Sequence, residues 1–195
     1  MRKENIQLFH EYSLNVETRA MYLGSCTDND GDESGTDYKM AERAIKNLLI
    51  LDAASDRPIT IYLNSPGGDT YHGFAIYDAI RSCTNYVRII GMGYVMSMGS
   101  VILQAGDERL LAPNAKMLLH YGSVNLGGNT KDVINWVETE KKEMRSLEDL
   151  YLEKIKVKHP KFSRAALQSK IRHDYILNAN EAVELGLAQR VLGND

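Results

Sequence analysis

Cysteine is scarce in this chain: its 195 residues include only Cys26 and Cys83. The two thiols lie far apart in sequence and neither belongs to a CxxC or CxxH motif, which excludes a disulfide framework and gives no support to a cysteine-based metal or redox site. With 44% hydrophobic residues, a chain of this length buries a core without such crosslinks. We therefore expect one domain spanning residues 1–195.

Long apolar runs are also missing. No stretch approaches the ~18 residues that a membrane span needs, and the first residues, MRKENIQLFHEY, lack the apolar core and cleavage site of a secretory signal. The formal net charge is −3, with basic and acidic residues interspersed, so no basic patch for nucleic acid or an anionic membrane is indicated. These absences disfavour nucleic-acid and membrane partners and predict a cytoplasmic protein.

Two ligand-binding motifs are absent or incomplete. The chain has no GxxxxGK[ST] element, so it does not bind nucleotide through a P-loop, and any ATP dependence would come from a separate partner. The acidic segment 27–37 contains Asp28, Asp30 and Asp32, but Glu33 stands where a calcium loop needs glycine and Lys39 where it needs glutamate. A solvated loop is predicted there, and no metal site.

Helical and extended patterns alternate along the first half of the chain. Apolar residues recur at helical spacing over residues 38–54, and residues 59–63 are typical of a buried strand. A helix over residues 71–83 and a strand over residues 86–91 follow, and then a turn into another short helix. Residues 6–23, rich in β-forming side chains, are expected to supply one or two strands. This alternation predicts an α/β layered fold.

The second half of the chain contains one long predicted helix, over residues 130–158, which is built almost entirely from strong helix formers. At 1.5 Å per residue it is roughly 40 Å long, more than a small domain needs to cover its own core. Part of it is therefore expected to project toward another subunit. Pro160 ends the helix, Ser163 and Asn178 are placed as caps of later helices, and Gly186 as a helix stop.

Three residues match the needs of serine hydrolysis, which requires a serine at a turn, an imidazole base and a carboxylate that orients the base. Ser97 begins a predicted helix, and Gly99 permits close approach at that turn. His120 ends the predicted strand 117–120, where a parallel sheet places functional groups. This position favours it over the other histidines, His10, His72, His159 and His173. Asp174 is the candidate carboxylate.

Each of these signals is weak when taken alone. A serine at a helix start is more often a simple N-cap, and a histidine at the end of an apolar strand is more often a half-buried structural residue. The glycine pair Gly67-Gly68 follows a predicted strand, as glycines do in many turns that bind nothing. Val95 stands where the G-x-S-x-G motif of α/β-hydrolases requires glycine, which excludes that motif.

The joint arrangement of these segments resembles the ClpP family of self-compartmentalising serine peptidases, from about residue 21 to residue 192. The order serine, histidine, aspartate is also that family's order, and it differs from those of the α/β-hydrolases, chymotrypsin and subtilisin. Five segments carry the resemblance: residues 61–68 (IYLNSPGG), residues 75–78 (AIYD), residues 93–99 (GYVMSMG), residues 117–120 (MLLH, shortly before Gly127-Gly128) and residues 174–187, which contain Asp174, Glu181 and Gly186.

The resemblance implies a ClpP/crotonase-like fold of repeated β-β-α units, with residues 130–158 as a protruding handle helix. It implies a serine endopeptidase that cleaves unfolded polypeptides and short peptides through an acyl-enzyme. Ser97 would be the nucleophile, His120 the base and Asp174 the residue that orients the base. The backbone amides of Gly68 and Met98 would hold the oxyanion.

The resemblance also implies an assembly and a partner. The handle helices would join two stacked heptameric rings, a tetradecamer, into a closed chamber. A separate Clp-type ring ATPase would unfold substrates and thread them in, and the peptidase itself would use no cofactor and no metal.

The chain departs from the family pattern at several positions. Val95 and Met96 replace small residues before the nucleophile, residues 71–72 (YH) follow the glycine turn where small or aliphatic residues are usual, and residues 121–123 (YGS) replace a polar-proline step after the base. These departures bear on substrate preference and not on the reaction. The N-terminal segment and residues 27–37 also differ, which leaves docking of an ATPase open and fits a divergent, phage-type member.

Three other interpretations stay open. A non-catalytic ring subunit is disfavoured because all three triad residues are present. Crotonase relatives use similar oxyanion glycines to bind acyl-CoA enolates, but they lack a serine–histidine pair at these positions. A serine–lysine peptidase would need Lys116, the nearest candidate base, which is more typical of a solvated residue before a strand.

Overall fold

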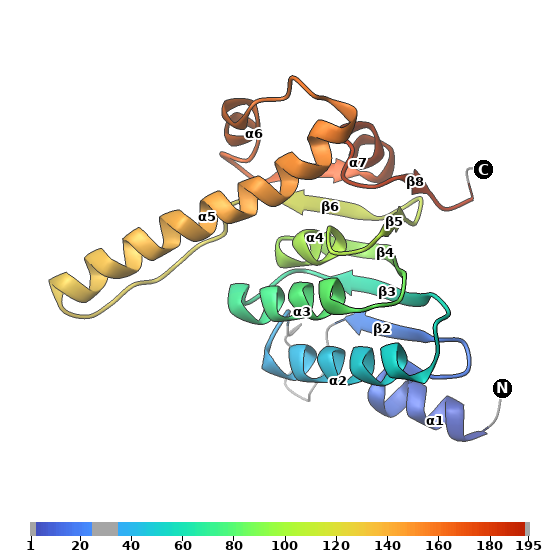
Figure 1. Cartoon of the computed structure of the whole chain (residues 1–195). Helices are drawn as coiled ribbons and strands as arrows, with labels where there is room; N and C mark the ends of the chain where they lie inside the picture. The colour runs from blue at the N-terminus through green and yellow to red at the C-terminus, as the bar shows by residue number, and fades with distance from the viewer. Residues whose placement is uncertain (1–2, 25–34, 194–195) are drawn as a thin grey trace.

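The computed structural model describes residues 3–24 and 35–193 (Figure 1). Most of the acidic segment 27–37 lies outside these residues, including Asp28, Asp30 and Asp32 of the rejected calcium motif. Cys26 lies outside them as well.

The N-terminal segment differs from its prediction. Residues Lys3–Tyr12 form helix α1, and the strands begin only with β1 (Leu14–Asn15) and β2 (Ala20–Gly24). The expectation of one or two strands within residues 6–23 is therefore confirmed by β1 and β2, whereas helix α1 was not predicted. Leu8 and Tyr12 are four residues apart and fall on one helical face, and both line a groove that α1 forms against the next helix.

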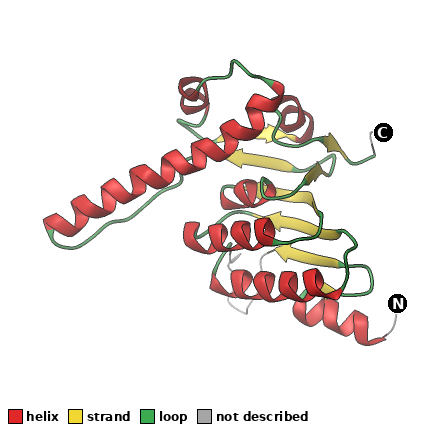
Figure 2. Cartoon of the chain, viewed as in Figure 1, coloured by secondary structure: helices red, strands yellow, loops and turns green. Residues whose placement is uncertain are grey.

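The central elements confirm the predicted alternation. They are α2 (Tyr38–Ala54), β3 (Ile59–Ser65), α3 (Thr70–Ser82), β4 (Val87–Met96) and α4 (Met98–Leu103). The three helices lie side by side over one face of the sheet (Figures 1 and 2). Every second residue of β3 is buried, as expected for a strand with a helix layer on one face.

The sheet has the strand order β1-β2-β3-β4-β5-β8, and most of its neighbours are parallel. The remaining strands are β5 (Glu108–Leu111), β6 (Lys116–Leu119), β7 (Tyr175–Asn178) and β8 (Arg190–Val191). Strand β4 is longer than the predicted strand 86–91: its first part pairs with β5 and its last three residues pair with β6. This change of neighbour along one strand carries the sheet into the C-terminal part of the chain.

The C-terminal helices lie where the sequence places them. They are α5 (Thr130–Lys158), α6 (Arg164–Lys170) and α7 (Ala179–Leu185). Ser163 caps α6, Asn178 forms a capping box with Glu181 at the start of α7, and Gly186 ends α7 in the left-handed region, at φ 91°. Each of these residues does what its local sequence predicts.

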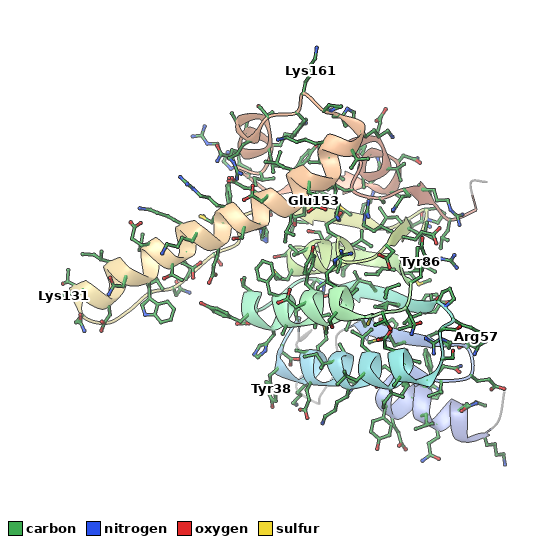
Figure 3. All side chains as sticks on the ribbon, in the orientation of Figure 1. Tyr38, Arg57, Tyr86, Lys131, Glu153 and Lys161 are labelled. Atoms are coloured by element: carbon green, nitrogen blue, oxygen red, sulfur yellow. The ribbon has the colours of Figure 1, made fainter. Side chains whose placement is uncertain are left out.

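Helix α5 projects away from the body of the molecule along most of its length (Figure 1). Lys131 lies at its far end, whereas Glu153 lies where the helix crosses the body (Figure 3). Its buried residues all fall in the C-terminal half: Glu148, Tyr151, Leu152 and Ile155. Among the helices of the described residues, none is both long enough and apolar enough to cross a membrane.

The core is continuous across these layers. One cluster of buried side chains includes Ile61 of β3, Ile89 of β4, Val101 of α4, Met117 of β6 and Leu177 of β7. The α/β body and the C-terminal strands therefore share a single hydrophobic interior.

One charged side chain is buried at the border between α5 and this body. Glu148 is 2% exposed, and its carboxylate accepts hydrogen bonds from the Tyr121 hydroxyl (2.6 Å), the Arg164 guanidinium (2.5 Å) and the Gln168 amide (3.0 Å). Burial by itself would raise the pKa of Glu148, but these three donors outweigh burial and hold the pKa below its ordinary value. The network therefore joins α5, α6 and the segment after β6 through an ionised carboxylate.

We predict that Glu148→Gln lowers the free energy of unfolding at pH 7 by about 1–3 kcal/mol, since charge-assisted hydrogen bonds are lost. The folded-state pKa of Glu148 lies below the unfolded value of about 4.3. Its contribution is therefore complete above that value and is lost as the pH falls through the folded-state pKa. Denaturant unfolding at several pH values should show the gap between wild type and variant closing below about pH 4.

The exposed Glu184 of α7 offers a control, because Glu184→Gln should open no such gap. A gap between wild type and Glu148→Gln that is unchanged or larger at acid pH would contradict the assignment of an ionised carboxylate.

Candidate active site

Ser97 occupies a strained turn between β4 and α4. Its backbone lies at φ 51° and ψ −123°, a conformation that costs an L-residue about 1–3 kcal/mol and persists only where its surroundings enforce it. Although Ser97 is the N-cap residue of α4, its side chain makes no capping hydrogen bond. The hydroxyl is thus free of the structural role that such a serine usually has.

Gly67 lies against this turn, and the next residue, Gly68, lies against Thr36. A Cβ atom at Gly67 would lie 2.4 Å from the Cβ of Ser97, and one at Gly68 would lie 2.4 Å from the backbone nitrogen of Thr36. Both glycines also have positive φ, at 105° and 141°, which favours glycine. A larger residue would collide with residues 96–97 at position 67 and with the Thr36 backbone at position 68.

The structure brings the three predicted side chains into one hydrogen-bonded row. Nε2 of His120 lies 2.8 Å from Oγ of Ser97, and Nδ1 of His120 lies 3.1 Å from Oδ1 of Asp174. The His120 side chain is 26% exposed and the Asp174 side chain 66% exposed. The imidazole is therefore partly shielded between the hydroxyl and a carboxylate that faces solvent.

Strand register accounts for this row. In the parallel pair β4–β6, Met96 lies opposite Leu118, and the N–H of Ser97 donates to the Leu118 carbonyl at 2.9 Å. In the antiparallel pair β6–β7, Leu119 lies opposite Tyr175. The residues next to these paired positions are Ser97, His120 and Asp174. Their side chains meet where β4 and β6 end and β7 begins.

The two residues expected to supply the oxyanion amides, Gly68 and Met98, lie on separate elements. Thr36 donates its N–H to the Gly67 carbonyl and accepts the N–H of Asp69 at 2.7 Å, which makes a parallel bridge opposite Gly68. In a parallel bridge of this kind, Gly68 lies between the two residues that bond to Thr36 and directs its own N–H away from Thr36. Met98 is the first residue of α4, where a helical N–H has no partner within the helix. Neither N–H donates to another residue of the ranges 3–24 and 35–193.

The segment after His120 is held by the buried carboxylate of Glu148. The hydroxyl of Tyr121 donates to Glu148, and burial together with this hydrogen bond raises the pKa of Tyr121 to about 12. Sequence reasoning placed Tyr121 only as a departure from a family pattern, and it did not identify Glu148 or Thr36. Glu148 lies within a helix rich in exposed charges, and Thr36 lies in a polar loop, so neither stands out by residue type.

The contacts of three rejected candidates give them no part in this hydrogen-bonded row. Lys116 is exposed at the start of β6, and it makes no hydrogen bond to Ser97 within the described part of the chain. Nε2 of His159 lies 2.8 Å from the backbone carbonyl of Glu184. Burial raises the pKa of the Cys83 thiol to about 11, which keeps it protonated and weakly nucleophilic. Among the described residues, no group of three or more His, Cys, Asp or Glu side chains could hold a metal ion.

Comparison with known proteins assigns the chain to a family. The Clp protease family model matches residues 32–195. The chain is 34% identical over 184 residues to the ATP-dependent Clp protease proteolytic subunit of Deinococcus radiodurans, covering 93% of this chain and 83% of the relative. It is 34% identical over 160 residues to proteolytic subunit 2 of Pseudomonas aeruginosa (81% and 77% covered) and 31% identical over 182 residues to that of Thermobifida fusca (92% and 83%). With most of its length matched in this way, the chain belongs to the Clp protease family.

Proposed function

We propose that Ser97, His120 and Asp174 are the catalytic triad of this serine peptidase. The observation that carries the proposal is the hydrogen-bonded row from Oγ of Ser97 through the His120 ring to Asp174, with 2.8 Å and 3.1 Å separations. A neutral imidazole at that distance takes the hydroxyl proton as the oxygen attacks, and a carboxylate on the other ring nitrogen fixes the tautomer and stabilises the imidazolium.

The reaction follows from these positions. Oγ of Ser97 attacks a peptide carbonyl carbon while its proton moves to Nε2 of His120, and the carbonyl oxygen becomes an oxyanion held by the N–H groups of Gly68 and Met98. His120 then gives the proton to the departing amine, which leaves an acyl-enzyme. A water molecule, deprotonated by His120, attacks the ester, and the acid product leaves as Ser97 regains its proton.

The substrate and partner are proposed from the relatives. Their names describe proteolytic subunits of ATP-dependent proteases, and this sequence contains no P-loop. We therefore propose that this chain hydrolyses unfolded polypeptides and short peptides, and that a separate Clp-type ring ATPase delivers the polypeptides.

No cofactor enters the proposed reaction. A cytoplasmic location completes the proposal, because such a partner consumes cytoplasmic ATP.

An oligomer is proposed from the part of α5 that leaves the body. Its N-terminal half carries large apolar side chains in solvent: Ile134 (57% exposed), Trp136 (49%), Val137 (37%) and Met144 (38%). Clustered exposed apolar residues of this kind mark protein interfaces. We propose that they pack against the same helix of other subunits and join two stacked heptameric rings. Native mass measurement should give a large multiple of the 21.9 kDa chain, and a monomer would exclude this assembly.

The other interpretations receive less support from the geometry. A non-catalytic ring subunit has no need to hold Ser97 in a strained turn within 2.8 Å of His120. An acyl-CoA enzyme of the crotonase type would use the oxyanion amides without that pair.

We predict that Ser97→Ala lowers kcat for a short fluorogenic peptide on the order of 10⁶-fold, because the nucleophile is lost while the fold is kept. A fluorophosphonate probe should modify wild-type protein at Ser97, as located by mass spectrometry of the digested adduct. Ser82→Ala serves as the control. Ser82 is exposed on α3, and its hydroxyl donates to the Ala79 carbonyl of the same helix. An assembled wild-type particle that stays unlabelled, with a Ser97→Ala variant as active as wild type, would refute the triad.

We predict that Gly68→Ala lowers kcat by about 10²–10³-fold, the usual effect of losing one oxyanion donor. The added methyl would lie 2.4 Å from the Thr36 nitrogen, so the chain must move and the N–H of residue 68 turns from its position. Gly127→Ala is the matched control, since nothing lies within 4 Å of a Cβ there, and it should keep wild-type kcat. Circular dichroism and native mass establish that both variants fold and assemble. Equal kcat values for the two folded variants would remove Gly68 from the oxyanion site.

A further inference from the structure

A buried polar chain reaches Ser97 from α5. Oγ of Ser100 donates to the Ser97 carbonyl at 2.7 Å, and the hydroxyl of Tyr151 lies 2.6 Å from the same Oγ. Ser100 is 0% exposed and Tyr151 1% exposed. The chain therefore links the helix that projects from the body to the backbone of the proposed nucleophile, without contact with solvent.

The direction of the two hydrogen bonds is fixed by proton count. A serine hydroxyl has one proton, and that of Ser100 is used on the Ser97 carbonyl, so Ser100 accepts from Tyr151. Burial raises the pKa of Tyr151 well above its ordinary value, which keeps the phenol protonated and able to donate. The order is Tyr151 to Ser100 to the Ser97 carbonyl.

The Ser97 backbone needs hydrogen bonds that hold it in its strained conformation. Its φ of 51° and ψ of −123° are unfavourable for a residue with a side chain, and this conformation directs Oγ to His120. The N–H of Ser97 is fixed by the Leu118 carbonyl, and the Ser97 carbonyl accepts the N–H groups of Ser100 and Val101 at 2.9 and 3.4 Å. The longer of these two is weak, so the Ser100 hydroxyl is the shortest hydrogen bond on that carbonyl.

Tyr151 lies in the buried stretch of α5, and its hydroxyl is hydrogen-bonded to Ser100. If the proposed triad is correct, we infer that Tyr151 is a positioning residue: through Ser100 it holds the Ser97 backbone in the conformation that aims Oγ at His120.

The experiment compares Tyr151→Phe, Ser100→Ala and the double variant. Each single variant should lower kcat for a short peptide roughly tenfold or more, since small displacements of a reacting group are costly. KM should stay near the wild-type value, because peptide binding is not changed. The rate of Ser97 modification by the fluorophosphonate should fall in parallel with kcat.

Thermal unfolding measurements distinguish a positioning role of Tyr151 from a purely structural one. Ser100→Ala leaves the Tyr151 hydroxyl buried without a partner and should lower the midpoint of thermal unfolding most. The double variant removes both polar groups, so its midpoint should return toward that of wild type, whereas its kcat should remain low. Ile155→Val, which trims a fully buried side chain on the same helix, should lower the midpoint with kcat within about twofold of wild type.

The outcomes are distinct. If kcat of the double variant recovers together with its stability, Tyr151 has only a structural role and the inference is overturned. The same conclusion follows if both single variants keep wild-type kcat. If wild-type protein neither turns over peptide nor reacts at Ser97, it is the proposed triad that fails, and both proposals fall with it.

Discussion

The arrangement of this molecule depends on the pairing of three strand ends, those of β4, β6 and β7. Parallel pairing of β4 with β6 sets Met96 opposite Leu118, and antiparallel pairing of β6 with β7 sets Leu119 opposite Tyr175. A shift of one residue in either pair would turn the side chains of one strand to its other face. The buried residues Met117 and Leu177 prevent such a shift, because it would expose them. Hydrophobic burial thus fixes the register, and the register fixes the distances in the site.

The strained backbone conformation of Ser97 persists because contacts from the neighbouring elements restrict that turn. Its N–H is bound by β6 through Leu118, and its carbonyl by the first turn of α4. Gly67 also lies close to Ser97, so that a methyl group added at position 67 would collide with the Ser97 side chain. A strained residue persists only when several such contacts agree. The same contacts leave the hydroxyl without a capping partner and so direct it toward His120.

Much of this architecture could be predicted from local sequence, and the failures have physical causes. The bounds of α5, predicted as residues 130–158, agree with the structure because helix formers and Pro160 define them locally. Strand β4 was predicted to end at residue 91. It continues through Gly93, which has φ 55°, to Met96. Strand pairing and the row of side chains it creates are non-local, so the residues indicated them only through their resemblance to a family.

The buried face of α5 explains why the residue after His120 differs from the family pattern. Residue 121 is a tyrosine whose hydroxyl reaches the buried carboxylate of Glu148, one turn from Tyr151 on the same helix. A buried carboxylate without donors would be costly, so Tyr121, Arg164 and Gln168 form a matched set with it. The segment after the base and the turn that carries Ser97 are therefore both hydrogen-bonded to one short stretch of α5. A movement of that stretch would therefore displace hydrogen-bond partners on both sides of the Ser97–His120 pair, because Tyr151 and Glu148 are both buried.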